Sequence, residues 1–177
     1  DQKSGTFFQF GKAEYFLALD GNEPVGRISA HVDYQYNKYR DGQTGRFGFF
    51  ECINDQEPAR LLFDAAEEWL RKYDRKRVNG PFNFTLYDAS GMLYNGFDSM
   101  PVVLLSYNPP YYNDLVANAG YQKEIDWYAF MVRESLTLRP SFKRIRQRVL
   151  NQGIQIKKLD LKKLDEAVEY IGIIFNE

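Results

Sequence analysis

The sequence holds one histidine and one cysteine, and each lies close to an acidic side chain. Ser29, His31 and Asp33 alternate along a segment with a strand-like pattern, so they share one face. Neighbours on such a face are about 7 Å apart, too far for the roughly 3 Å contacts of a Ser-His-Asp relay. His31 alone stays a candidate acid–base group, because imidazole titrates near neutrality. Cys52 follows Glu51 without a nearby histidine, which favours a small buried side chain over a nucleophile.

Composition argues against several kinds of site. Zinc sites draw mainly on His and Cys, and with one of each no metal is expected. Apolar runs such as 102–105 are far shorter than the roughly 20 residues of a membrane helix, so no membrane partner is expected. A net charge of −1 gives no overall field that would recruit nucleic acid or anionic lipid. One cysteine and no visible secretion signal make the cytoplasm the expected location.

The hydrophobic pattern predicts the strands that must position these residues. Strands are expected over 14–19, 25–34 and 46–53, as an antiparallel meander. Asp20-Gly21 predicts the first turn, and the polar residues 35–44 predict the second. In the second strand one face is packed, and the face that bears His31 meets solvent or a cleft. In the third strand, Glu51 shares the face of Phe47, Phe49 and Ile53.

The rest of the chain alternates helices and strands. An apolar stripe predicts a helix over 61–73, preceded by Asn54 or Asp55 as its cap. The remaining expected elements are a strand near Val78, an irregular segment over 88–99, a strand over 101–107, a helix over 109–119 closed by Gly120, a strand over 121–132, a helix from Ser141, a short strand over 154–156 and a helix over 159–175.

The end of the chain differs in charge from the rest. Nine of the 23 basic residues lie between Arg139 and Lys163, where Asp160 is the one acid. Two interpretations are open: complementary surfaces within a larger protein, or a patch for nucleic acid or phosphate. We favour the first, because charge runs are usually solvated faces and because the body of the chain is acidic.

The order of elements over residues 14–132 resembles the GNAT acyltransferase superfamily. Two short segments carry the resemblance. Residues Pro24-Val25-Gly26-Arg27-Ile28 are similar to the entry into a strand of that fold, and Asn118-Ala119-Gly120-Tyr121 are similar to a helix end and the turn after it. The resemblance implies an α+β fold with a mixed, mostly antiparallel central sheet flanked by helices. Residues 1–138 then form a GNAT-like domain without its usual first strand and helices. Residues 139–177 form a basic linker helix and a strand–helix unit, which begins a second such domain or supplies the missing elements.

The resemblance also implies an activity. A GNAT protein of this kind is an acyl-CoA-dependent N-acyltransferase, which uses acetyl-CoA or another acyl-CoA and passes the acyl group to an amine of a small molecule or peptide. The residues that the resemblance implies are Glu51 or His31 as general base, Ile53, Asn54, Gln56 and Asn108 against the coenzyme, and Asn83, Tyr87 and Tyr112 against the acceptor.

The chain departs from the superfamily pattern at two places. The turn 53–60 has no glycine. Asp55 and Glu57 would repel a bound phosphate by their negative charge, and Pro58 lacks the backbone N–H that would donate to it. Val116 occupies the position where the family places a tyrosine acid. A second interpretation is therefore a GNAT-like scaffold or binding domain that has lost the coenzyme site and works with another domain or subunit. A nucleic-acid-binding module is a third, which we favour least.

Overall fold

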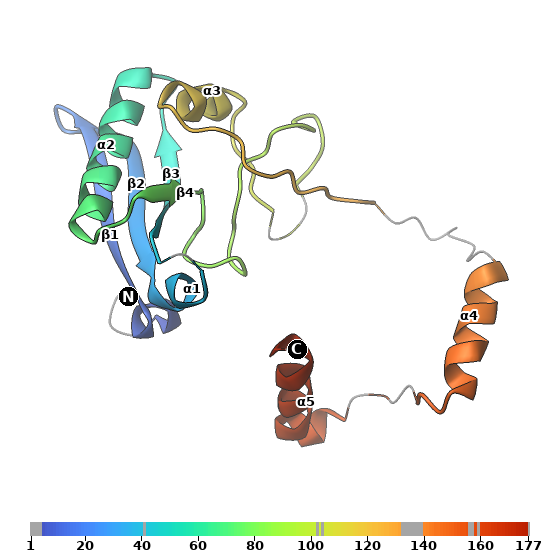
Figure 1. The fold of residues 1–177 in the computed structure, drawn as a ribbon. Coiled ribbons are helices and arrows are strands. Elements are labelled where there is room, and N and C mark those ends of the chain that lie inside the picture. The colour runs from blue at the N-terminus through green and yellow to red at the C-terminus, as the bar shows by residue number, and fades with distance from the viewer. Residues whose placement is uncertain are drawn as a thin grey trace. The chain divides into compact units, whose positions relative to one another are not determined.

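The computed structural model describes residues 5–40, 42–101, 103, 105–131, 140–155, 158 and 160–176. The chain divides into two compact units, Asp1–Asp126 and Trp127–Glu177. Among the described residues, the first unit holds the sheet, and the second holds the helices near the end of the chain (Figure 1). The expectation that residues 139–177 begin a second GNAT-like domain stays a prediction.

The first unit is built on a four-stranded sheet in the order β1-β2-β3-β4. The strands are β1 (Gly11–Asp20), β2 (Glu23–Asp33), β3 (Thr44–Cys52) and β4 (Arg77–Asn79). The first three pair antiparallel as the sequence predicts, and the short β4 runs parallel to β3. The α+β class with a mixed, mostly antiparallel sheet flanked by helices is thereby confirmed (Figure 1).

Helix α2 (Gln56–Lys72) covers one face of this sheet and forms the core with it. Asp55 caps the helix by accepting a hydrogen bond from the backbone N–H of Glu57, one of the two caps expected. The buried side chains of α2 pack closely on the strands. A Cβ added at Gly45 of β3 would lie 2.5 Å from a methyl of Leu70 on α2. Helix α3 (Tyr111–Asn118) extends this core and ends before Gly120, as predicted.

The opposite face of the sheet is covered at one end and open at the other. The 3₁₀ helix η1 (Thr6–Gln9) brings Phe7 into a stack on Phe84, with ring centroids 4.7 Å apart. Ser29 and His31 lie with no exposed surface on this face. The prediction that this face of β2 meets solvent or a cleft is therefore wrong at the Ser29–Asp33 end, because η1 and the segment around Phe84 cover it.

A bulge in β3 changes which side chains face the core. Arg27 pairs with Glu51, but Ser29 pairs with Gly48, so β3 carries one extra residue. Phe49 lies at the bulge with φ +49°, and its N–H donates to the Asn83 side chain at 2.8 Å. Phe47 packs on Phe63 from the core side, whereas Glu51 is exposed. The expectation that Glu51 shares the face of Phe47 is wrong, because the extra residue reverses the alternation.

Several expected elements differ in the structure. The expected turn over 35–44 contains the short helix α1 (Tyr34–Tyr39), because Asp33 accepts from the N–H of Tyr36 at 2.8 Å and caps it. The described residues of 101–107, 121–132 and 154–156 form no strand, so these three predictions are wrong there. They pair with no other strand, and Val103 is 86 % exposed. Residues 102, 104, 132 and 156 lie outside the described residues.

The second unit contains the two helices expected near the end of the chain. They are α4 (Pro140–Asn151), which carries four basic and no acidic residues, and α5 (Leu164–Asn176), preceded by the 3₁₀ turn η2 (Leu161–Lys163). No helix in the described residues is long and apolar enough to cross a membrane.

Candidate active site

A cavity of about 310 Å³ opens on the sheet at the end of β3 that lies beside α3. Three residues singled out from the sequence, Glu51, Ile53 and Tyr112, line it together. The full lining is Leu17, Pro24, Val25, Gly26, Arg27, Glu51, Cys52, Ile53, Tyr111 and Tyr112. Strands β1, β2 and β3 thus supply its floor, and the first turn of α3 supplies one wall.

Glu51 is held from two sides within this cavity. Its Oε2 accepts a hydrogen bond from the Tyr112 hydroxyl at 3.0 Å, and its Oε1 lies 3.5 Å from an Arg27 guanidinium nitrogen. The Arg27 and Glu51 side chains are 58 % and 59 % exposed, so the ion pair itself contributes at most about 1 kcal/mol. The carboxylate is therefore fixed in direction yet remains open to a ligand that enters the cavity.

Two neighbouring tyrosines attach α3 to the end of β3. The Tyr112 hydroxyl accepts from the N–H of Cys52 at 3.1 Å, and the Tyr111 hydroxyl donates to the carbonyl of Cys52 at 2.9 Å. Burial, with the Glu51 carboxylate adding to it, raises the pKa of Tyr112 to about 12. Tyr112 therefore keeps its proton at neutral pH and serves as a donor to Glu51.

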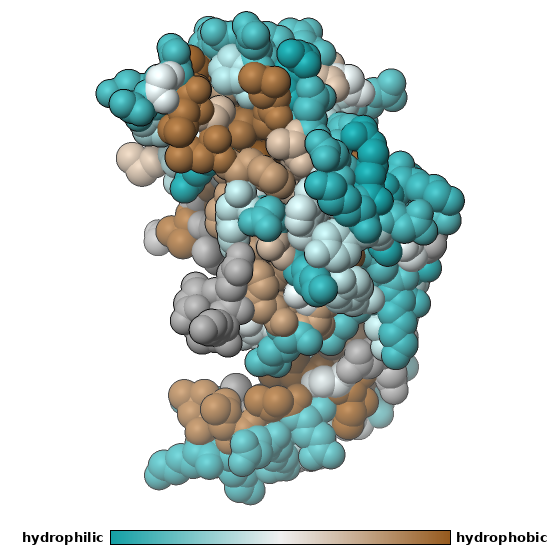
Figure 2. All heavy atoms as spheres, turned by 90° about the vertical axis from the view of Figure 1, so that its left-hand side faces the viewer, coloured by the Kyte–Doolittle hydropathy of each residue, from teal (hydrophilic) through white to brown (hydrophobic). Residues whose placement is uncertain are grey.

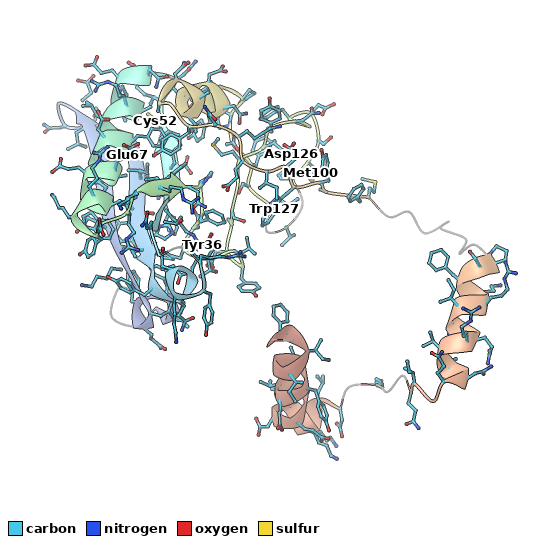
Figure 3. The ribbon with its side chains drawn as sticks, in the orientation of Figure 1. Tyr36, Cys52, Glu67, Met100, Asp126 and Trp127 are labelled. Carbon is cyan, nitrogen blue, oxygen red and sulfur yellow. The ribbon has the colours of Figure 1, made fainter. Side chains whose placement is uncertain are left out.

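Cys52 lies at the α3 end of β3, with its side chain on the core face (Figure 3). Burial, and then the charge of Asp55, raise the pKa of its thiol above the ordinary value. A protonated, buried thiol is a poor nucleophile, which agrees with the packing role expected for it.

The N-terminus of α2 is occupied by its own acidic residues. The Asp55 side chain accepts a hydrogen bond from the N–H of Glu57, which lies in the first turn. The Gln56 side chain donates to the carbonyl of Leu115 at 3.1 Å. Asn54 is exposed on this turn and is not among the residues that line the cavity. These residues do not fit the diphosphate of a coenzyme at this place, because the charge is negative and a donor is already used.

Three other candidates lie away from the cavity lining. Asn83 accepts the N–H of Phe49 at the bulge, and Tyr87 is 76 % exposed in the irregular segment. Asn108 is buried and accepts from the N–H of Leu93 at 2.7 Å, so its side chain ties the irregular segment to the start of α3. Their roles toward a coenzyme or an acceptor stay predictions.

His31 is buried on the same sheet face, about 13 Å along β2 from Arg27. Its ring meets Phe7 and Phe84 edge-on, each at 5.6 Å between centroids, and neither ring nitrogen has a hydrogen bond of good geometry in the described part of the chain. It is not part of the cavity lining, so the structure does not bring the two candidate bases together.

Two features of this site have no local signal in the sequence. Arg27 lies on a strand face, but its pairing with Glu51 joins two different strands. The bulge depends on Asn83, which lies 34 residues from Phe49 in the sequence. Among the described residues, no group of three or more His, Cys, Asp or Glu side chains could hold a metal ion.

Two curated proteins are similar to this chain. A protein named "Bacterial ceramide synthase" from Caulobacter vibrioides (strain NA1000 / CB15N) is 34 % identical over 176 residues, which is 99 % of this chain and 46 % of that protein. "Protein YghO" from Escherichia coli (strain K12) is 31 % identical over 162 residues, 91 % of this chain and 41 % of that protein. The chain thus spans less than half the length of either relative. The name of the Caulobacter protein fits the acyltransferase class predicted from the sequence.

No family model matches the chain, and no solved structure matches it. Membership of the GNAT superfamily therefore stays a prediction.

Proposed function

We propose that this chain forms part of an N-acyltransferase, which transfers an acyl group from an acyl thioester to an amine in the cavity at Glu51. The observation that carries the proposal is the carboxylate of Glu51, oriented by Tyr112 and Arg27 inside an open cavity. A ceramide is an amide of a long-chain amino alcohol, so the name of the Caulobacter relative supports transfer to nitrogen.

Glu51 is the proposed general base. The amine attacks the thioester carbonyl, a C–N bond forms, and the amine proton passes to a carboxylate oxygen of Glu51. The C–S bond then breaks, and the thiolate leaves without needing a strong acid because thiols are already acidic near pH 8.5. Tyr112 is a positioning residue here: its hydroxyl holds Oε2 and stays protonated, so Oε1 is the oxygen that receives the proton.

The acyl donor is proposed to be an acyl-CoA, which the sequence resemblance implies. The α2 N-terminus does not fit the coenzyme diphosphate, so no step is assigned to that part of the donor. This misfit is also the observation that favours a second candidate function: a GNAT-like scaffold that has lost the coenzyme site and supports a catalytic domain elsewhere.

The test is an acyl-transfer assay with the full chain, dodecanoyl-CoA and a set of primary amines, following release of free thiol and formation of the amide. Glu51→Gln keeps the shape of the side chain and should lower the rate by about 10²–10⁴-fold, the usual contribution of a general base. Glu68→Gln is the matched control, because Glu68 is an exposed acid on α2 outside the cavity lining.

Equal rates for Glu51→Gln and the parent chain would refute the role of Glu51. If the chain released no thiol with any donor and amine, and a thermal-shift titration showed no binding of dodecanoyl-CoA, the scaffold function would replace the proposal.

A further inference from the structure

A second cavity, of about 440 Å³, lies next to the first on the same face of the sheet. Its lining residues are Tyr15, Phe16, Leu17, Arg27, Ile28 and Phe49. Leu17 and Arg27 line both cavities, so the second begins where the first ends. Leu17 pairs with Arg27, which pairs with Glu51, and these three residues therefore lie in a row across strands about 4.8 Å apart.

The second cavity has an apolar surface that faces solvent. On β1, Tyr15 and Leu17 point away from the α2 core and are 47 % and 60 % exposed. Seen from the left-hand side of Figure 1, hydrophobic residues gather in the upper part of the surface (Figure 2). Contiguous exposed apolar surface next to a polar group marks a place where an apolar ligand binds.

Aromatic rings lie together at the Tyr15 end of this cavity. The Phe49 ring lies 6.3 Å from that of Tyr15 and 5.0 Å from that of Phe84, measured between centroids. Phe84 in turn stacks on Phe7, which η1 holds in place. An alkyl chain that entered past Leu17 would therefore meet an apolar wall beyond Tyr15.

Charge is confined to the junction of the two cavities. Arg27 is the one charged residue in the lining of the second cavity, and Glu51 is the one acid in either lining. A ligand with an amine at one end and an alkyl chain at the other matches this distribution. The exposed Arg27–Glu51 pair contributes little, so an amine can compete for the carboxylate.

We propose that the second cavity binds the alkyl chain of an amphiphilic amine whose nitrogen lies beside Glu51 in the first cavity. The inference rests on the proposed function, because it takes the amine as the acceptor of the acyl group. The alkyl chain crosses Leu17 and ends against Tyr15 and Phe49, which makes these residues the determinants of acceptor chain length.

The experiment is a calorimetric titration of the full chain with butylamine, octylamine and dodecylamine, each below its micelle concentration. Burying a methylene tightens binding by about fourfold, so affinity should rise steeply from butylamine to octylamine. Leu17→Glu places a charge in the path of the alkyl chain and should remove this dependence on chain length. Leu19→Glu is the matched control: it lies on the same strand, is 55 % exposed in the parent chain and lines neither cavity.

Circular dichroism checks that both variants keep the fold, and Leu17→Ser repeats the test without a charge if Leu17→Glu does not fold. Equal affinity for butylamine and dodecylamine would overturn the inference, as would an unchanged dependence on chain length in a folded Leu17 variant. Dodecanoate has a long alkyl chain without the amine, and if it bound as tightly as dodecylamine the cavity would belong to the acyl donor instead.

The binding experiment separates this inference from the proposed function. Binding that depends on chain length, without acyl transfer in the assay above, would refute the function and keep the alkyl site. Acyl transfer to short and long amines with equal efficiency would keep the function and refute the alkyl site.

Discussion

Acid should destabilise the first unit through His31. This side chain has no exposed surface and packs against Phe7 and Phe84, and Arg46 carries a positive charge close by. Burial and then the charge of Arg46 lower the pKa of His31 from 6.5 to about 3. The folded chain therefore keeps the imidazole neutral at pH values where an unfolded chain has already protonated it.

The sign and size of the effect follow from this difference in pKa. Between pH 6.5 and 3 the unfolded state binds up to one more proton at His31 than the folded state, so the free energy of unfolding falls as pH falls. The loss approaches about 1.4 kcal/mol per pH unit and totals about 2.7 kcal/mol between pH 7.5 and pH 4.5. Above about pH 7 both states hold a neutral imidazole, and His31 adds no pH dependence.

The assay compares urea unfolding of the parent chain and His31→Leu at pH 7.5 and pH 4.5. Leucine is close to histidine in volume and cannot take up a proton, so any packing cost is the same at both pH values. Carboxylates such as Asp33, which pairs with Arg46 at 3.5 Å, are present in both proteins and largely cancel. We expect the stability of the variant relative to the parent to rise by about 2.7 kcal/mol on going to pH 4.5. An identical pH dependence of the two proteins would refute a buried neutral His31.

Two further changes test the packing of the sheet and the bulge that carries the site. Leu70→Ala should lower the free energy of unfolding by about 2–5 kcal/mol because Leu70 is fully buried, whereas Leu61→Ala on the exposed side of the same helix should cost under about 1 kcal/mol. Comparable losses in urea melts would contradict the assignment of the α2 core face. Asn83→Ala removes the acceptor of the Phe49 N–H and should cost about 1–3 kcal/mol; an unchanged urea midpoint would show that the bulge does not depend on this bond.

Local patterns were sufficient for the elements that carry their own signals. Helix α2 has an apolar stripe and a capping aspartate within one window, and β1 and β2 are joined by Asp20-Gly21, where Gly21 has φ +59°. The described residues of 101–107 form no strand although the segment is apolar, because an apolar segment becomes a strand only where another strand is free to pair with it. Whether such a partner strand is present depends on residues far away in the sequence.

The candidate site was predicted only in part for a similar reason. Glu51 and Ile53 are adjacent on β3, and Tyr112 meets them because α3 returns to the end of that strand 61 residues after Glu51. The face of Glu51 was predicted wrongly, because strict alternation does not anticipate an extra residue whose N–H is satisfied by Asn83.

The bulge at Phe49 absorbs one residue of β3 and so decides which face each later side chain takes. Deleting the extra residue at the bulge would restore strict alternation and leave Glu51 opposite Arg27 on the cavity face, with Cys52 on the core face. Pairing every residue of β3 without a bulge would instead turn Glu51 toward α2 and Cys52 into the cavity. Sequences related to this one are therefore best aligned by the pairing of this strand with β2, since a gap of one residue at the bulge keeps the carboxylate at the cavity.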